Sequence, residues 1–220
     1  MWDNAVIMMI VKNIFITLYM TLGSTLVAYL LGLPMGIALV ITAKDGLRPN
    51  RIGYKILDVF VNIVRSVPFL ILLILVMPFT RLIVGKTYGP TATIVPLVLA
   101  AAPFIARMVE SSLLEVDKGV IEAAQSMGAS LWTIIFKVLL GEARTSLIVG
   151  ATISLGTILG YSAMAGIVGG GGLGDIAIQY GYYRYQADIM WVTVILLVLL
   201  VQLMQFIGTK LSKKLDKRIR

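Results

Sequence analysis

Residues 13–43 read NIFITLYMTLGSTLVAYLLGLPMGIALVITA, a run that contains no Asp, Glu, Lys or Arg. A helix needs about 20 consecutive apolar residues to cross the roughly 30 Å hydrocarbon core of a bilayer. This run is long enough to cross once, and it contains no charged loop at which two spans would part. The stretch therefore predicts a membrane-spanning first helix.

The composition of the chain points in the same direction. Of the 220 residues, 59% are hydrophobic and 14% are charged, whereas a soluble domain has about 25% charged residues. Too few polar side chains remain to cover a water-facing surface, so we expect an all-α integral membrane protein. The chain has no Cys and no His, which excludes thiol nucleophiles, disulfides, Cys/His zinc sites and Ser-His-Asp triads.

Four further stretches lack charged residues, and three of them are long enough to cross a membrane as they stand. The exception, 66–80, reaches the length of a span only when it is extended back past Arg65. We therefore expect a single transmembrane domain over 1–220 with five transmembrane helices, at about 13–43, 57–80, 88–112, 144–168 and 188–210.

The distribution of Lys and Arg predicts the orientation, because these residues accumulate on the cytoplasmic side. With the N-terminus outside and the C-terminus in the cytoplasm, 15 of the 19 basic residues lie inside. The basic tail from Lys210 to Arg220 is expected to lie beside anionic lipid headgroups. This accounts for the net charge of +8 with membrane lipid as a partner and without nucleic acid.

The longest segment predicted to lie in the cytoplasm is 115–142. Its apolar residues recur at steps of three or four, which is typical of an amphipathic helix; they are Val116, Val120, Ala124, Met127, Leu131 and Ile135. Outside the bilayer, such a helix can rest on lipid, pack against its own bundle or dock into a groove of a partner. The periodicity leaves these three possibilities open.

Within this segment stand EAAQSMG (122–128) and VLLG (138–141). The pattern resembles the EAA loop of importer-type ABC permeases, written EAA-x3-G-x9-I-x-L-P, with Val138 and Gly141 in place of Ile and Pro. The EAA-x3-G core is intact. A lone Glu-Ala-Ala is a weak signal, but this spacing in a cytoplasmic loop between two spans makes it strong.

The resemblance implies that this segment is a short coupling helix that contacts an ATPase. Ala123 and Ala124 would let the helix seat closely on the partner. Glu122 would stand at the start of the helix, where a carboxylate favours the helix dipole, and Gly128 would let the chain turn without a Cβ clash.

Four other stretches are similar to the permease subunits of methionine-importing ABC transporters: 65–69, 94–116, 160–166 and 172–182. The resemblance implies a homodimer of permeases, two cytoplasmic ABC ATPase subunits and an external binding protein that delivers methionine or a related small amino acid. It places the chain in the bacterial cytoplasmic membrane. ATP and Mg²⁺ would be bound by the ATPase, and this chain would hold no cofactor, metal or catalytic residue.

A small, weakly polar stripe runs along the fourth predicted span. Gly150, Ser154, Thr157 and Tyr161 lie at i, i+4, i+7 and i+11, on one face of a helix. We take Ser154, Thr157, Tyr161, Ser162 and Met164 as candidates for the translocation pathway, with tight helix packing as the alternative. An unbranched thioether adapts its shape, so we hypothesise that Met164 from each of two subunits closes a gate.

Other residues are expected to have structural roles. Gly156 and Gly160 form a small-x3-small pair that suits close helix packing, and Gly32 and Gly36 form another. Arg65 is the best candidate for a buried charge. It either snorkels to the inner surface or, with Pro68 three residues on, braces the loops that receive force from the coupling helix.

The glycine run GGGGLG (169–174) satisfies the letters of G-x-G-x-x-G but follows an apolar helix instead of a strand, so a dinucleotide site is not expected. A flexible outer turn that accommodates a docking protein is the interpretation we adopt.

Two further classes of protein compete with an ATP-driven importer. An ion-gradient-driven transporter of small apolar amino acids usually needs intramembrane acids or His, or inverted repeats, whereas the acids here cluster at span ends. A membrane-embedded protease needs a general base, and His is absent. The gradient-driven transporter is kept as the alternative.

Overall fold

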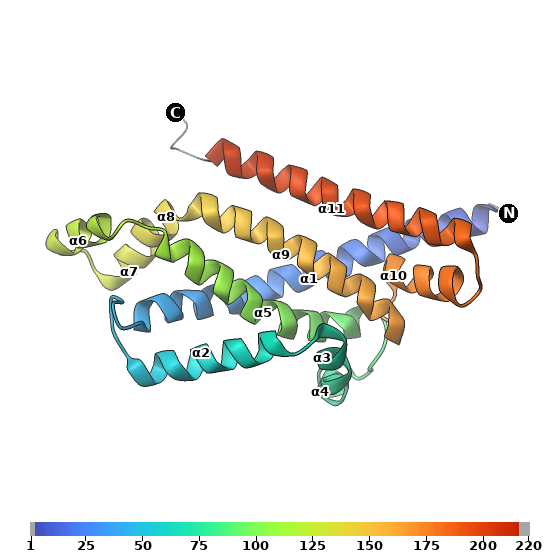
Figure 1. Cartoon of the computed structure of the whole chain (residues 1–220), viewed down its shortest axis with the longest axis horizontal. Coiled ribbons are helices and arrows are strands. Elements are labelled where there is room, and N and C mark those ends of the chain that lie inside the picture. Colours follow the sequence, from blue (N-terminus) through green and yellow to red (C-terminus); the bar gives the residue numbers. More distant parts are fainter. Residues whose placement is uncertain (1–2, 216–220) are drawn as a thin grey trace.

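The computed structural model describes residues 3–215, and every element within that range is helical (Figure 1). The expected all-α fold is confirmed. Four long helices run side by side along the molecule: α1 (Asn4–Thr42), α5 (Pro90–Leu114), α9 (Arg144–Met164) and α11 (Ala187–Leu215). Lys217, Arg218 and Arg220, which belong to the predicted lipid-facing basic tail, lie outside the described residues.

Shorter elements connect the long helices. They are α2 (Arg51–Ser66), α3 (Phe69–Leu75), α4 (Met77–Val84), α6 (Lys118–Ser126), α7 (Leu131–Thr133), the π-helical segment η1 (Ile134–Leu139), α8 (Leu140–Glu142), the 3₁₀ turn η2 (Ala165–Val168), α10 (Gly172–Ile176) and the π-helical segment η3 (Ala177–Tyr182). By length and composition, α1, α5, Arg144–Val168 and α11 can each cross a membrane. The count becomes five if α2 and α3 together form one bent span.

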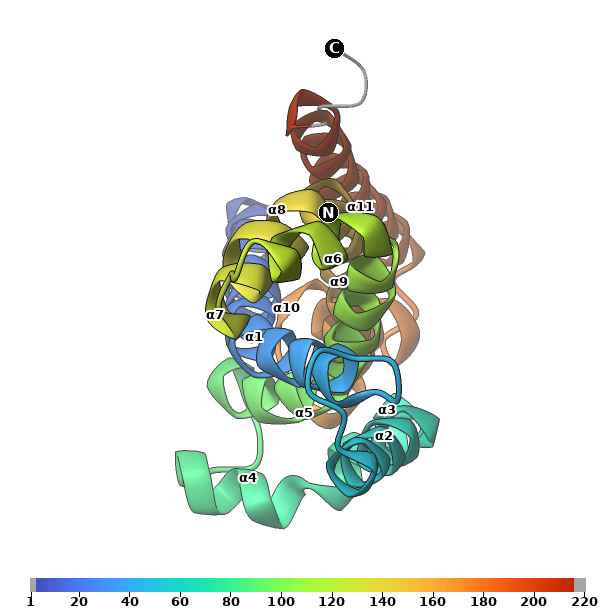
Figure 2. The ribbon, with the colours of Figure 1, turned by 90° about the vertical axis from the view of Figure 1, so that its left-hand side faces the viewer.

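The second expected span, 57–80, is not one straight helix. It is divided among α2, α3 and α4, and α2 and α3 meet at 104°. The cause lies at Pro68, which has no N–H to donate and forces Val67 out of the helical region, to φ −81° and ψ 125°. Seen from the end of the molecule, α3 and α4 run crosswise below the other helices (Figure 2).

The close approach of α1 and α5 depends on two glycines. A Cβ on Gly32 would stand 2.7 Å from the carbonyl oxygen of Ala102, and one on Gly36 would stand 2.6 Å from that of Ala106. Any larger residue would push the helices apart. The small-x3-small packing predicted for the first span is therefore confirmed.

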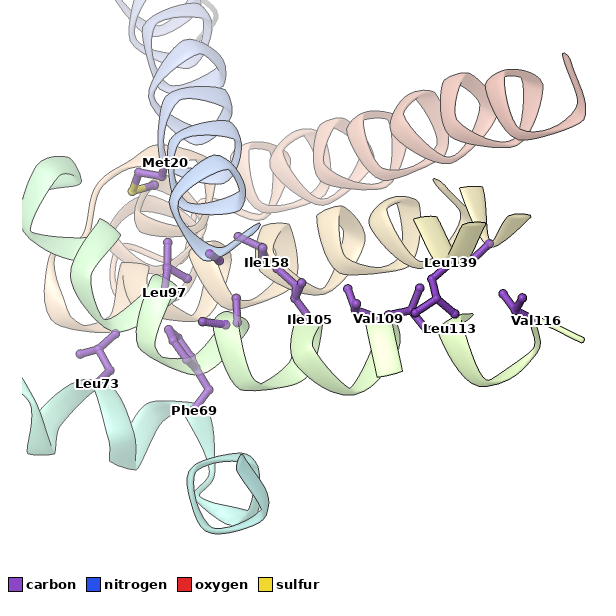
Figure 3. Packing of buried hydrophobic residues seen from close by; sticks show 14 of the residues in the cluster. Met20, Phe69, Leu73, Leu97, Ile105, Val109, Leu113, Val116, Leu139 and Ile158 are labelled. Atoms are coloured by element: carbon purple, nitrogen blue, oxygen red, sulfur yellow. The ribbon is translucent and has the colours of Figure 1, made fainter. Parts of the chain in front are cut away.

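The apolar core follows α5 along its length. Leu97, Ile105 and Leu113 of α5 are almost completely buried, and Met20 of α1 and Ile158 of α9 pack into the same cluster (Figure 3). By contrast, α11 leaves large apolar side chains such as Leu203 more than half exposed. The long helices thus enclose a core around α5 and present apolar outer faces that suit a lipid environment.

The glycine run does not form the flexible turn expected from the sequence. Gly172 has a φ of +82°, and a Cβ there would meet the Thr17 hydroxyl at 2.7 Å. The N–H groups of Gly172 and Leu173 donate to Asn13 Oδ1 at 3.0 Å and Thr17 Oγ1 at 2.9 Å. The glycines allow the backbone to press against α1, and side-chain acceptors on α1 hold α10 in the bundle.

Candidate coupling surface and translocation pathway

The EAA motif lies on α6 and the turn after it. Asp117 caps the helix by accepting the Gly119 N–H at 2.7 Å. The helix ends at Ser126, and the chain then turns at Gly128, whose φ of +76° is costly for a residue with a Cβ. The expected turn at Gly128 is confirmed. Glu122 stands in the middle of α6, so its predicted place at the helix start was wrong; Asp117 holds that position.

The single amphipathic stripe expected over 116–135 is also wrong, because the chain turns at Gly128. Within α6, Ala124 is 6% exposed and packs into the main apolar cluster, whereas Glu122 and Ala123 are exposed. Met127 is 81% exposed. The helix therefore rests on its own bundle along one side and presents the rest of the motif outward, at the end of the molecule that faces the viewer in Figure 2.

A cavity of about 510 Å³ adjoins this surface. It lies between α6 and the loop that joins α1 to α2, and both Glu122 and Gln125 line it, together with Lys44 and Lys118. Apolar residues from the end of α5 complete its walls. The candidate coupling surface thus has a cavity with charged lining residues beside it.

The candidate pathway residues on α9 differ in exposure. The Ser154 and Ser162 side chains are buried and donate to backbone oxygens of Gly150 at 2.8 Å and Leu159 at 2.7 Å. Hydroxyls bonded to their own helix present little polarity to a solute. Met164 is 47% exposed. The two serines thus fit the packing alternative, and Met164 stands on an open face.

Thr157 and Tyr161 are half-buried. The Thr157 hydroxyl donates to the Ile153 oxygen at 3.1 Å, and the Tyr161 ring stacks on Phe69 of α3, with 4.5 Å between centroids and 5° between planes. Sequence reasoning missed Phe69, although it directly follows the singled-out Pro68.

Gly156 and Gly160 of α9 are not packed closely against another helix of this chain. A Cβ on Gly160 would meet nothing within 4 Å, and one on Gly156 would come no closer than 3.9 Å, to Gln205 Nε2. Gly156 and Gly160 therefore border open space beside α9, and the close packing suggested by their small-x3-small spacing is not formed with another helix of this chain.

Arg107 is a partly buried charge, whereas Arg65 is not. Arg65 is exposed, whereas the Arg107 side chain is 19% exposed and pairs with Glu110 at 2.6 Å and with Asp58 of α2. It also donates to Asn62 Oδ1 at 2.9 Å. The local pair of Arg107 and Glu110 expected from their spacing exists, but the cluster reaches across to α2, 49 positions earlier in the chain.

Comparison with known proteins assigns the family. Residues 28–220 match the family described as "Binding-protein-dependent transport system inner membrane component". The chain belongs to this family. The helices that are long and apolar enough to cross a membrane agree with the inner-membrane location named in this description.

Two relatives can be aligned with most of this chain. It is 52% identical over 202 residues to the "Probable D-methionine transport system permease protein MetI" of Vibrio cholerae, covering 92% of this chain and 90% of that one. It is 46% identical over 180 residues to the "Methionine import system permease protein MetP" of Bacillus subtilis, covering 82% and 81%.

A solved structure carries the same fold. A chain from the inward-facing MetNI methionine ABC transporter matches with a TM-score of 0.97 and 46% identity, over 98% of this chain and 100% of that one. This chain therefore shares its overall fold, over nearly its full length, with a chain of that transporter.

Proposed function

We propose that this chain is the membrane-spanning permease subunit of an ATP-driven importer that takes up methionine or a related small amino acid, in either the D or the L form. The observation that carries the proposal is the EAA motif on α6, exposed at one end of the bundle. The substrate assignment is supported by the names of the MetI, MetP and MetNI relatives.

The proposed assembly contains two copies of this chain, two cytoplasmic ATPases and an external binding protein. The N-terminus lies outside, and the second of five spans is the bent pair of α2 and α3. ATP and Mg²⁺ are bound by the ATPases, because the only Gly-Lys pair, Gly85-Lys86, has Thr80 where a P-loop requires its first Gly. No catalytic step is assigned to this chain.

In the proposed mechanism, ATP binding draws the two ATPases together and moves α6 with them. The contact with the ATPase is formed by the coupling residues Glu122, Ala123, Ala124 and Gly128. The exposed residues among them contact the ATPase, and buried Ala124 transmits the motion to the core. The segment Ile134–Leu139 continues the chain from these coupling residues toward α9. Movement of α9 then opens the bundle alternately to each side.

Met164 remains the proposed gate. Its side chain is 47% exposed on α9, and Thr157 and Tyr161 share that helix. In the homodimer, two flexible thioethers would meet across the pathway and yield to an apolar solute. Ser154, Ser162, Gly156 and Gly160 are proposed to shape the wall behind them, and Pro68 to fix the bend beside it.

The test is reconstitution with the ATPase and the binding protein. Glu122→Lys should leave the purified chain as thermostable as the parent, because Glu122 is exposed, but should lower ATP-driven methionine uptake at least tenfold by reversing the charge at the contact. Glu142→Lys reverses an exposed acid outside the motif and should retain uptake.

Equal uptake by the two variants would contradict the role of the motif. Uptake by this chain alone, driven by an ion gradient, would favour a secondary transporter instead. The structure gives that alternative little support, because the acids Asp58 and Glu110 are already paired with Arg107.

A further inference from the structure

The break between α2 and α3 directs one aromatic ring toward α9. Pro68 stands at the N-cap of α3, and Phe69 is the first residue of that helix. The Phe69 side chain is 7% exposed and lies in the same apolar cluster as Leu97 and Ile158 (Figure 3). A proline at this point fixes the backbone just before the ring, so the break places Phe69 at the start of α3, where its ring reaches Tyr161 of α9.

The ring stacks on Tyr161. Their centroids lie 4.5 Å apart, and the planes are within 5° of parallel. Stacked aromatic pairs attract one another beyond the apolar area that they bury. Tyr161 lies three residues before Met164 on α9, so the contact is made within one helical turn of the exposed thioether.

Beyond Phe69, α3 leaves most of its large apolar side chains exposed or only partly buried. Ile71, Ile74 and Leu75 are between 53% and 68% exposed, and only Leu72 and Leu73 join Phe69 as buried side chains of this helix. Earlier in the same span, α2 is tied to α5 by Arg107. The bent span is therefore fixed to α5 on one side of its break and stacked on α9 on the other side.

We propose that Phe69 is a positioning residue for transport, whose ring sets the place of Tyr161 on the pathway helix and makes α3 follow α9 through the cycle. This inference rests on the proposed function, since it takes α9 as a wall of the pathway. Without the flat ring, Tyr161 gains freedom, the pathway near Met164 closes less tightly, and ATP hydrolysis drives less uptake.

The test compares Phe69→Leu, which removes the flat ring, with Phe69→Tyr, which keeps it. Leu72→Val is the matched control, because Leu72 is a buried apolar residue of the same helix with the same 7% exposure. Each variant is reconstituted with the ATPase and the binding protein in proteoliposomes. The primary measurement is methionine taken up per ATP hydrolysed, with thermal unfolding recorded for every variant.

A second measurement reports the pathway directly. The chain has no Cys, so Met164→Cys provides a single thiol, and its rate of modification by a hydrophilic maleimide is compared with and without Phe69→Leu. We expect Phe69→Leu to raise this rate roughly three- to tenfold and to lower uptake per ATP by a similar factor, as loss of one aromatic pair predicts. Phe69→Tyr and Leu72→Val should stay within about twofold of the parent.

Two results would overturn the inference while leaving the proposed function intact. One is normal coupling and an unchanged maleimide rate in Phe69→Leu; the other is an equal loss of coupling in Leu72→Val, which would reveal general loosening of α3. If the parent complex shows no ATP-dependent methionine uptake, the proposed function fails, and the inference fails with it.

Discussion

At the scale of a single residue, Arg107 joins two helices through several polar partners. Its side chain is 19% exposed, and Asp58 and Glu110 are 28% and 12% exposed. Arg107→Gln leaves two partly buried carboxylates without their cation, which should lower the free energy of unfolding by about 1–3 kcal/mol, between the values for surface and buried pairs. The measurement is the melting temperature of the detergent-solubilised chain.

Arg65→Gln is the matched control, because Arg65 is exposed, and its melting temperature should equal that of the parent. Adding Asp58→Asn and Glu110→Gln to Arg107→Gln should recover most of the lost stability, since neutral groups leave no unpaired charge. A melting temperature for Arg107→Gln equal to that for Arg65→Gln would show that the cluster contributes nothing to stability.

At the scale of an element, α10 is held by side chains of α1. Thr17 is 1% exposed and accepts the Leu173 N–H at 2.9 Å. Thr17→Val keeps the shape but leaves that buried N–H without an acceptor, which should cost about 1–3 kcal/mol. Hydrogen exchange at 172–176 should accelerate correspondingly, because the first turn of α10 then opens more readily.

Thr25→Val provides the comparison for this variant. Thr25 donates only to the Thr21 oxygen of its own helix, at 2.6 Å, so its loss should leave exchange at 172–176 unchanged. If both variants exchange alike, α10 is held by burial of Leu173 and the other apolar residues instead of by the α1 acceptors.

Local chemistry in the sequence predicted some of these elements and not others. The long apolar runs predicted the long helices. The absence of a Cβ predicted a turn at Gly128. Pro68 was singled out, but a proline does not specify in which direction the next helix departs, so the 104° bend was missed. The pairing of Asp58 with Arg107 joins residues 49 positions apart, a separation at which periodicity carries no information.

The same limit applies to the candidate site. The sequence left two roles open for the hydroxyl residues of α9, pathway lining and helix packing, and in the structure the Ser154 and Ser162 hydroxyls each donate to a carbonyl oxygen of their own helix. The run of glycines suggested flexibility, whereas their small size serves the contact of Gly172 with Thr17. Composition identifies small and polar positions; only the packing of helices decides which of them face a solute.

At the scale of the whole molecule, the two ends of the bundle differ in charge. The end that holds α6 also holds the α1–α2 loop with Lys44 and Arg48, and Arg51 at the start of α2, whereas the loop before α11, which carries Tyr185, lies at the opposite end (Figure 1). The accumulation of Lys and Arg on the cytoplasmic side of membranes predicts that α6 lies in the cytoplasm and Tyr185 lies outside. Coupling to a cytoplasmic ATPase requires this orientation.

Because the chain has no Cys, single thiols report the orientation without background. Tyr185 is 91% exposed and Met127 is 81% exposed, so both positions accept a probe with little effect on packing. In intact spheroplasts, a membrane-impermeant maleimide should label Tyr185→Cys and leave Met127→Cys unlabelled; permeabilisation should make both react. The reverse pattern would place the EAA motif outside the cell, where no ATPase can reach it, and would refute the proposed mechanism at its first step.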